Sequence, residues 1–430
     1  MSRMRKKNKA VTPAPVATLS GLFLLSALAV FFACFSILGV KLSNAPSLPW
    51  EQLIPVGVYL AGMPLLLILL KMIGWKGDAG LPGATFLLCG IGLVIQFRMG
   101  SFSQGLARPL ALLPFPLGLA AFCAGVIMTS KGRGRWLADT GWLAYLAAAG
   151  VFVMMLLLGR RFRGGVYMPG NMNPSEIIKP LLVIFLAAYL SRRQKDFSET
   201  QIGIPVPALD SLLALIFLWA LPMLFVFLLK DLGLLMLMNA TLIIMLFAIS
   251  HGTGYLALGV TAVTAAAFGM RVISSNVRNR FDVWLNPFSD PTGKGWQVLQ
   301  ALCAMYSGGV WGAGLGSGVP QAVPIVTSDF IYAAMAEELG LFGCALILMV
   351  YAILFSRGFR AAGATRTPFE RLLCVGLTGS LAVQTLINVA GVTKALPMTG
   401  VTLPFISHGG SSLITSMLIA GLLTGLTDRK

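Results

Sequence analysis

Charged residues are scarce in this sequence, and acidic residues are the scarcest. Only 11% of the 430 residues are charged, and only 15 are Asp or Glu, whereas roughly a quarter of the residues in an ordinary soluble domain are charged. Because so few charges cannot cover a water-facing surface, a soluble globular domain is excluded. Hydrophobic residues make up 57% of the chain, and the mean hydropathy is +0.84. Most of the chain is therefore expected to face lipid or other helices.

Metal-ligating side chains are also few. The sequence has only two histidines, His251 and His408, and its six cysteines show no CxxC spacing. A histidine-rich metal or haem site is therefore excluded, and the cysteines are expected to be packing residues. The net charge of +17 comes from Lys and Arg residues that punctuate apolar segments and do not gather on a soluble face. Nucleic acid is therefore not an expected partner, whereas the lipid bilayer is.

Long apolar runs fill most of the chain. A helix that crosses a bilayer core of about 30 Å needs about 20 apolar residues, and about twelve segments meet this length. The first segment follows a basic N-terminus without a small-residue cleavage site, so we expect it to be retained. The sequence predicts an all-α polytopic membrane protein with spans at 16–40, 53–73, 81–97, 108–128, 136–158, 175–191, 211–229, 232–250, 254–272, 331–356, 371–391 and 401–426.

The distribution of Lys and Arg predicts the orientation of these spans. Of the 32 basic residues, 19 lie in the first nine residues, in alternate short connections and at the C-terminus. Cytoplasmic segments carry such an excess, so both termini are predicted to be cytoplasmic. The one long connection, 273–330, then falls on the outer side. Its aromatic residues favour packing or an interfacial position over disorder.

The few acidic residues in or beside the spans are the first functional candidates, because ionisable groups in a membrane are costly and tend to mark function. Glu176 and Lys179 lie three residues apart at the start of the sixth span, so they share one helix face. Two interpretations stay open. The pair either forms a capped, ion-paired helix start, or it holds the charged headgroup of a ligand. The other acidic residues of this kind are Asp231, Asp290, Asp329, Glu337 and Glu338.

The second candidate is a turn in the long outer connection. Asp290 is followed by Pro291 and Gly293, and Arg278, Arg280 and Lys294 lie nearby in sequence. An aspartate in a turn is most often structural. The alternative is that the basic residues bind the phosphates of a lipid carrier while the carboxylate exchanges a proton.

Two further segments contain unusual backbone signals. The glycine run 308–318 lacks the GK[ST] ending of a P-loop, so nucleotide binding is not expected. We expect it instead to form a tightly packed or re-entrant outer loop. The segment 403–412 interrupts the start of the last span. Such an interruption is tolerated only where the backbone lines a cavity or packs against protein.

Taken in order, these segments resemble the motifs of the SEDS family, which includes FtsW, RodA and SpoVE. Residues 173–179 resemble the family's QPSE…K segment, 231–233 resemble the end of PDLG, and 286–297 resemble NPxxDPxGxGxQ. The remaining matches are 308–316 with GGxxGxGLG, 328–331 with TDFIF, 337–340 with EELG, and 403–412 with LPFISYGGSS. The resemblance covers residues 159–426, and the order of the motifs makes it specific.

The resemblance implies a SEDS-type helical bundle in the bacterial cytoplasmic membrane, with its active site facing outward. Such a bundle polymerises lipid II into glycan strands beside a class B penicillin-binding transpeptidase. The resemblance implies that Asp290 is catalytic as the general base. No metal ligands are assigned, and the only cofactor considered is a divalent cation. The implied substrate-binding residues are Glu176, Lys179, Arg278, Arg280, Lys294, Gln297, Asp329, Ser407 and Ser411.

The sequence also departs from the family pattern. Five predicted spans precede the 173–179 segment, whereas the family has three, so two extra N-terminal helices are expected. We therefore divide the chain into N-terminal spans at 1–158 and a SEDS core at 159–430, with the catalytic loop at 273–330. Single-residue departures are Asn173 for glutamine, Lys230 for proline, Ile325 for an acidic residue and His408 for tyrosine.

Two other functions stay open at this point. One is a transporter that flips a lipid-linked cell-wall precursor, although the candidate residues cluster at the outer face. The other is a non-catalytic scaffold of a cell-wall synthesis complex, although Asp290, Glu176 and Lys179 are all present. The sequence does not distinguish a division, elongation or sporulation role.

Overall fold

The chain is described here from a computed structural model. The structure describes residues 16–42, 53–102, 113–162, 165–167, 173–198, 200–201, 204–205, 207–250 and 252–428.

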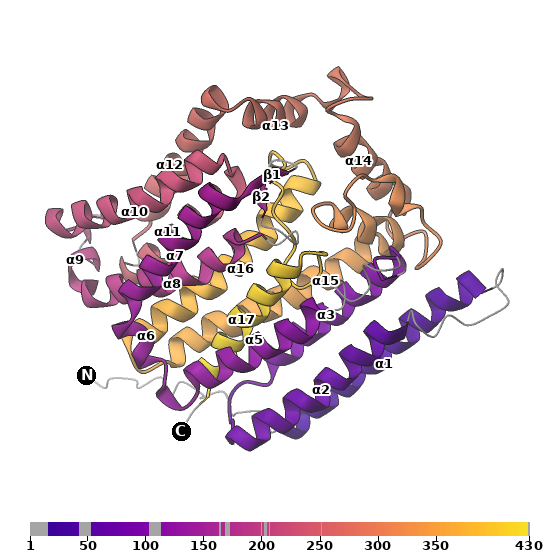
Figure 1. Ribbon diagram of the computed structural model, residues 1–430, viewed down its shortest axis with the longest axis horizontal. Helices are drawn as coiled ribbons and strands as arrows, with labels where there is room; N and C mark the ends of the chain where they lie inside the picture. Colours follow the sequence, from indigo (N-terminus) through magenta and orange to yellow (C-terminus); the bar gives the residue numbers. More distant parts are fainter. Residues whose placement is uncertain are drawn as a thin grey trace, which may run out of the picture.

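The described chain is a bundle of long helices (Figure 1). Ten of the described helices are long and apolar enough to cross a membrane. Two further helices, α8 (Ser175–Arg192) and α17 (Gly410–Leu426), correspond to the other two predicted spans. They are not among the ten because α8 contains charged residues and α17 is short. The all-α polytopic fold is therefore confirmed. The ten are α1 (Val16–Leu42), α2 (Ile54–Ile73), α3 (Gly80–Arg98), α5 (Pro114–Thr129), α7 (Gly141–Leu158), α10 (Leu209–Leu229), α11 (Leu232–Ser250), α12 (Gly254–Ile273), α15 (Ile331–Ala364) and α16 (Pro368–Val392).

Short elements connect the long helices. On one side of the bundle these are the helices η3 (Ser130–Gly132), α6 (Arg135–Asp139) and α9 (Gln194–Ser198). Two antiparallel strand pairs are also present: β1 (Arg160–Phe162) with β2 (Gly165–Tyr167), and β3 (Thr200–Gln201) with β4 (Ile204–Pro205). The long connection contains α13 (Ser275–Leu285), η4 (Pro287–Ser289), α14 (Trp296–Gly308) and η5 (Pro320–Ala322).

The long connection 274–330 is ordered and arches over one end of the bundle (Figure 1). We call this end, which also carries the segment 393–409, the loop end. Phe281 of α13 is buried and packs against Trp284, with their ring centroids 6.0 Å apart. The Trp284 indole N–H donates to the Lys394 carbonyl at 3.0 Å. These contacts explain why a connection so rich in aromatic residues is folded.

The last predicted span begins later than expected. The sequence predicted a span at 401–426, but α17 begins at Gly410. Residues 401–409 are held outside a helix because the Ser407 hydroxyl accepts from the Leu403 N–H at 2.8 Å and donates to the Ser328 carbonyl at 2.7 Å. Phe405 adopts a φ of +67°, which a right-handed helix does not allow.

Other predicted boundaries also differ. The span predicted at 331–356 corresponds to α15, which continues to Ala364. The span predicted at 108–128 corresponds to α5, which begins at Pro114, and 103–112 lie outside the described residues. The span predicted at 136–158 is divided at Thr140 between the short α6 and α7.

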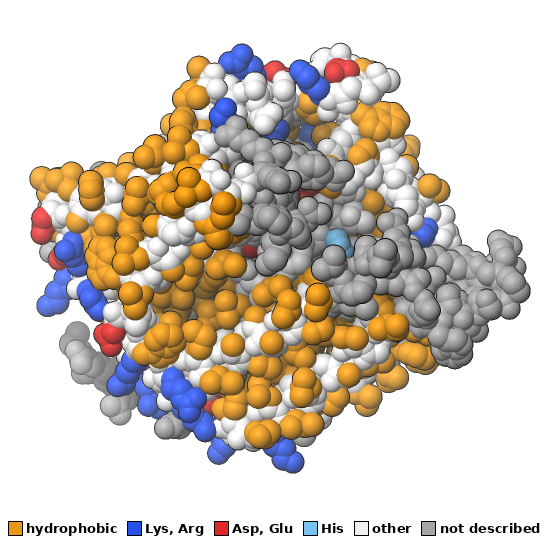
Figure 2. Space-filling model, in the orientation of Figure 1, with side chains coloured by type: hydrophobic (Ala, Val, Ile, Leu, Met, Phe, Trp, Pro, Cys, Tyr) orange, Lys and Arg blue, Asp and Glu red, His pale blue; other side chains and the backbone are white. Residues whose placement is uncertain are grey.

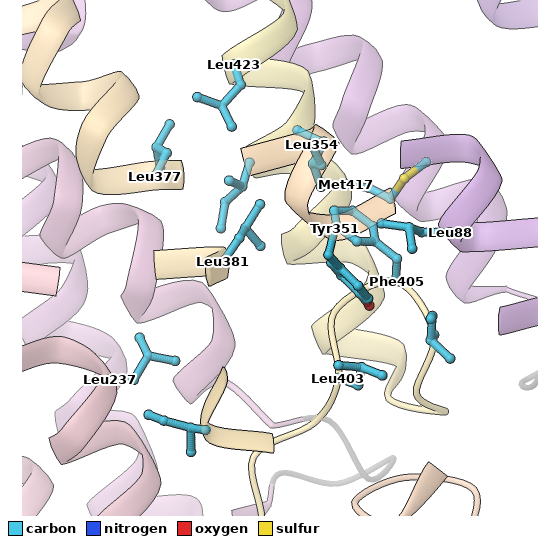
Figure 3. Packing of buried hydrophobic residues seen from close by; sticks show 14 of the residues in the cluster. Leu88, Leu237, Tyr351, Leu354, Leu377, Leu381, Leu403, Phe405, Met417 and Leu423 are labelled. Carbon is cyan, nitrogen blue, oxygen red and sulfur yellow. The ribbon is translucent and has the colours of Figure 1, made fainter. Parts of the chain in front are cut away.

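The core is built on a very close contact between α5 and α17. A Cβ atom added at Gly125 of α5 would lie 2.7 Å from the Leu422 nitrogen of α17, so only glycine fits there. The Thr129 hydroxyl of α5 donates to the Leu422 carbonyl at 2.9 Å. Small residues commonly allow membrane helices to approach in this way, because lipid gives little hydrophobic drive for association. Figure 3 shows Met417 of α17 close to Leu88 of α3 and Tyr351 of α15 in the same core.

The N-terminal helices α1 and α2 lie at one edge of the bundle (Figure 1). The Tyr59 hydroxyl of α2 donates to the Phe86 carbonyl of α3 at 2.7 Å, and the Tyr59 and Phe115 ring centroids lie 5.4 Å apart. Helices α3 and α5 in turn pack against α15 and α17. The N-terminal spans therefore share a continuous core with the rest of the chain. The division of the chain into N-terminal spans at 1–158 and a core at 159–430 stays a prediction made from the sequence.

On the face shown in Figure 2, large apolar side chains cover the side of the bundle, and Lys and Arg side chains lie toward its ends. Met72, Leu157 and Phe217 are each at least 77% exposed. Exposure of this kind suits a surface that faces hydrocarbon. The protein is a multi-pass membrane protein.

At the end opposite to the loop end, polar contacts fasten the α2–α3 connection to α15 and α17. The Asp78 carboxylate accepts from the Gly80 N–H at 2.8 Å and pairs with the Arg357 guanidinium at 3.1 Å. The Trp75 indole N–H donates to the Thr424 carbonyl at 3.1 Å. These contacts join the N-terminal helices to the C-terminal ones.

Replacing Asp78 should loosen this junction. We expect Asp78→Ala to lower the free energy of unfolding by about 1–2 kcal/mol, because it removes both a helix-start acceptor and a partly buried ion-pair partner. The matched control is Asp282→Ala, since Asp282 pairs with Arg271 in an exposed setting, and we expect that change to cost at most about 0.5 kcal/mol. Thermal unfolding of the purified protein in detergent measures both. Equal shifts in the two variants would contradict the assigned role of Asp78.

Candidate functional site

Glu176 and Lys179 form an ion pair at the loop end of α8. The helix begins at Ser175, whose N–H and hydroxyl both donate to the Asn173 side-chain oxygen, at 3.1 and 2.6 Å. The Lys179 ammonium donates to the Glu176 carboxylate and, at 2.7 Å, to the Gln384 side-chain oxygen of α16. Glu176 is 8% exposed and Lys179 is 3% exposed. The predicted ion-paired helix start is therefore present, and the headgroup interpretation stays a prediction.

A chain of hydrogen bonds continues from this pair into α17. The Gln384 amide donates to the Thr402 carbonyl at 3.0 Å, and the Thr402 hydroxyl lies 2.8 Å from the Ser412 hydroxyl. The neighbouring Ser411 hydroxyl accepts from the Asn173 N–H at 3.2 Å. The predicted residue Ser411 therefore lies beside the start of α8, the helix that carries Glu176 and Lys179.

Arg280 and Asp329 approach the same region from the long connection. The Arg280 guanidinium donates to the Met398 carbonyl at 3.2 Å and also to the Thr399 carbonyl. A Cβ atom added at Gly400 would lie 3.5 Å from the Arg280 guanidinium and 3.6 Å from the Asp329 carboxylate. Both side chains therefore flank the turn at Gly400, whose φ is +78°.

Asp231, in the turn between α10 and α11, belongs to the same group. Burial raises the pKa of Asp231, whereas its hydrogen bond from the Leu234 N–H and the charge of Arg280 lower it. Glu176 raises this pKa and Lys179 lowers it through their charges. These effects place Asp231 within electrostatic reach of the other charges. We call the residues Glu176, Lys179, Asp231, Arg280, Asp329 and Gln384 the polar cluster.

Sequence reasoning did not identify two contributors to this region. Gln384 links the polar cluster to α17, and Asn388, four residues later on α16, donates to the Asp329 carbonyl at 3.0 Å and to the Val401 carbonyl at 2.7 Å. Both are 1% exposed. The signal that could have identified them is a pair of amide side chains four residues apart on one face of a membrane span.

Asp290 lies apart from the polar cluster, in the turn between η4 and α14. The Lys294 N–H donates to the Asp290 carboxylate at 3.0 Å, and the Gly295 N–H donates to the Asp290 carbonyl at 2.9 Å. A Cβ atom at Gly293 would lie 2.7 Å from the carboxyl carbon of Asp290. Glycine at 293 therefore lets the chain fold closely around a carboxylate that stays half-exposed.

Helix α13 connects the Asp290 turn to the polar cluster. The Lys294 ammonium donates to the Asn279 side-chain oxygen at 3.0 Å, and the next residue on the helix is Arg280. Helix α13 therefore contacts the Asp290 turn through Asn279 and contributes Arg280 to the polar cluster. Within the described residues, no hydrogen bond or ion pair joins Asp290 directly to the polar cluster.

The other predicted residues have mainly structural contacts. The Arg278 guanidinium donates to the Val272 carbonyl at 2.9 Å, at the end of α12. The Gln297 amide donates to the Pro324 carbonyl at 3.0 Å. Ser407 is buried and holds the bend before α17. A substrate role for these three residues stays a prediction.

Glu337 and Glu338 stabilise the glycine run. The Arg98 guanidinium of α3 pairs with the Glu338 carboxylate at 2.7 Å and donates to the Gly318 carbonyl at 2.8 Å. The Glu337 carboxylate accepts from the Val319 N–H at 2.7 Å. The expected tightly packed loop is therefore present, and these two acidic side chains hold it against the start of α15.

The arrangement offers cations and a carboxylate at one end of the molecule. Arg280 has the charge and donors to bind an anion such as a diphosphate, and Asp290 can accept a proton. Lys179 adds a second positive charge, and its buried ammonium bonds to Glu176 and Gln384. Across the described residues, no group of three or more His, Cys, Asp or Glu side chains is positioned to hold a metal ion. The arrangement suits transfer of a group from a phosphate carrier to a hydroxyl.

Comparisons with known proteins give a consistent picture. The FtsW/RodA/SpoVE family model, described as cell cycle protein, matches residues 141–430. The chain is 31% identical over 434 residues to the peptidoglycan glycosyltransferase RodA of Mycobacterium tuberculosis, covering 97% of this chain and 92% of that protein. It is 35% identical over 265 residues to stage V sporulation protein E of Bacillus subtilis, covering 60% of this chain and 69% of that protein.

Solved structures show the same fold. A chain of a peptidoglycan synthase complex, described as coordinating polymerization and crosslinking, superposes with a TM-score of 0.64 at 24% identity. The superposition covers 81% of this chain and 96% of that chain. The RodA rod-shape-determining protein of Thermus thermophilus gives a TM-score of 0.58 at 22% identity, covering 82% and 96%. The chain belongs to the FtsW/RodA/SpoVE family, the SEDS family.

Proposed function

We propose that the protein is a peptidoglycan glycosyltransferase that polymerises lipid II into glycan strands, with Asp290 as the general base. Membership of the FtsW/RodA/SpoVE family and the likeness to RodA proteins named as peptidoglycan glycosyltransferases support the activity. The observation that carries the mechanism is the position of Asp290. Its half-exposed carboxylate sits in the arch above the loop end, where Arg280 joins α13 to the polar cluster.

The proposed reaction moves one proton and exchanges one bond. The Asp290 carboxylate takes the proton of the acceptor sugar 4-hydroxyl, and that oxygen attacks the anomeric carbon of the donor sugar. The bond from this carbon to the phosphate oxygen breaks as the new glycosidic bond forms. The lipid diphosphate then leaves with its negative charge, which Lys179, Arg280 and Lys294 stabilise.

The proposed orientation places the loop end outside the cell and both termini in the cytoplasm. The excess of Lys and Arg in the short connections at the opposite end supports this orientation. Residues 274–330 and the polar cluster would then face the side on which glycan strands are built.

The proposed partner is a class B penicillin-binding transpeptidase. The support is the likeness to a chain of a peptidoglycan synthase complex in which polymerization and crosslinking are coordinated. A transpeptidase beside the loop end would receive each glycan strand as it forms.

Asp290→Ala should lower the rate of polymerisation at least about 100-fold, because a general base contributes roughly 10² to 10⁴ in rate. The measurement is the initial rate of glycan chain formation from purified lipid II in detergent, with and without the transpeptidase. The matched control is Asp282→Ala on α13, which removes a carboxylate that pairs with Arg271. This variant should polymerise within about twofold of the wild-type rate. An Asp290→Ala protein that keeps the wild-type rate rules out the proposed base. A wild-type protein that makes no chains under any condition overturns the transferase function in favour of a transporter or scaffold.

Lys179 gives a second prediction, in which stability and activity separate. Lys179→Met leaves the Glu176 carboxylate buried without its partner, so it should lower the free energy of unfolding by about 3–5 kcal/mol. The double variant Glu176→Gln with Lys179→Met removes that charge and should recover most of the stability. Activity should stay low in both variants, because the cation that faces the diphosphate is missing. Thermal unfolding and polymerisation are measured on the same samples; recovery of activity together with stability would show that Lys179 is only structural.

A further inference from the structure

A cavity of about 70 Å³ lies at the loop end of the N-terminal helices. Its walls come from α2, α3, α5 and the segment 405–413. Val58, Leu93 and Phe115 contribute from the three helices, and Phe405, Ile406 and Leu413 contribute from the segment. Sequence reasoning assigned no role to the helices that form most of this cavity.

The cavity is lined by the terminal turns of three long helices. Pro55 and Pro114 line it from the first turns of α2 and α5, and Gln96 lines it from the last turn of α3. Each of these turns is at the loop end of its helix. With the loop end outside the cell, the cavity falls in the outer leaflet.

The chemistry of the walls favours an apolar occupant. The Gln96 amide already donates to the Thr327 carbonyl at 2.9 Å and to the Ile406 carbonyl at 3.3 Å, and the Ser407 hydroxyl is already bonded to Ser328. These two polar side chains are therefore occupied by protein partners. The third polar side chain of the lining, His408, lies on the segment between the cavity and Ser411. Most of the remaining lining is aliphatic or aromatic, and such side chains do not supply the two to four polar partners that a buried water needs.

The cavity and the polar cluster share one wall. Residues 405–410 line the cavity, while the next residues, Ser411 and Ser412, bond to Asn173 and Thr402 in the chain that leads to Lys179. Only the segment 405–412 would therefore separate an apolar chain in the cavity from the region of the cations proposed to hold a diphosphate.

We propose that this cavity binds part of the prenyl chain of the lipid-linked sugar substrate, so that α2 contributes to substrate binding. This inference rests on the proposed function, because the carrier of lipid II joins a diphosphate to a long apolar chain. One water-sized group needs about 10–15 Å³, so the cavity takes a short stretch of the chain and leaves the rest in the bilayer. The N-terminal helix pair then has a role beyond supporting the bundle.

The test is photolabelling of the full-length protein in detergent. The probe is undecaprenyl diphosphate with a photoreactive diazirine in its prenyl chain, and the readout is the fraction of labelled peptide from residues 54–73, measured by mass spectrometry. We expect labelling of this peptide, and we expect excess unlabelled undecaprenyl diphosphate to remove it. Phosphatidylglycerol at the same concentration should not.

Variants that fill the cavity make the test specific. Val58→Phe on α2 and Leu93→Phe on α3 should each reduce the labelling about tenfold, a loss that corresponds to displacing about two methylene groups from an apolar site. The matched control is Leu65→Phe, because Leu65 lies on α2, is 57% exposed and does not line the cavity. Its labelling should equal that of the wild type.

Two outcomes would overturn the proposal. Equal competition by phosphatidylglycerol would show a general site for bilayer lipid, and absence of label from residues 54–73 would show that the chain lies elsewhere. The labelling reads binding without turnover, so it is independent of the proposed transferase function. Labelling without polymerisation would overturn the proposed transferase function and support the prenyl site. Polymerisation without labelling would support the transferase function and overturn the prenyl site.

Discussion

The organisation of the loop end depends on one buried ion pair. An ammonium and a carboxylate removed from water each cost several kcal/mol unless other groups satisfy them. Lys179 and Glu176 meet this condition because Gln384 of α16 supplies a further acceptor, and Gln384 is itself held by Thr402. The start of α8 therefore determines how α16 and the segment before α17 must sit. The close contact of α5 with α17 at Gly125 places α17 where Ser412 can complete the chain.

Around this fixed region, the long connection brings in the remaining groups through one helix. Helix α13 is anchored by Phe281 and Trp284, and its polar residues Asn279 and Arg280 contact the Asp290 turn and the polar cluster. The carboxylate of Asp290 is oriented by backbone groups of its own turn and not by the bundle. The cationic side chains are thus set in the packed core, while Asp290, the proposed proton acceptor, is carried by a surface loop. Functional residues are commonly placed in this way, on loops held by a rigid scaffold.

Much of this organisation could be predicted from sequence, and the reasons are physical. Span length follows from bilayer thickness, and the Glu176–Lys179 pair follows from the three-residue spacing on a helix. The interruption of the last span at 403–412 could be predicted from its residues, but the start of α17 at Gly410 could not. Leu403 and Phe405 are as apolar as span residues, and a contact that holds the bend comes from Ser328, far away in sequence. The link from Lys179 to Gln384 joins residues 205 positions apart, which no local pattern reveals.

The pairing of Arg98 with Glu338 has a consequence for how the protein is made. The two residues are 240 positions apart, so Arg98 leaves the ribosome and enters the membrane long before its partner exists. Arg98 is the last residue of α3 and lies at its loop end, where water can hydrate the guanidinium until its partner is made. The guanidinium becomes buried only when the glycine run and Glu338 pack against it. The packing of the end of α3 against the start of α15 therefore forms only after α15 has been synthesised, so this contact is completed after α3 has entered the membrane.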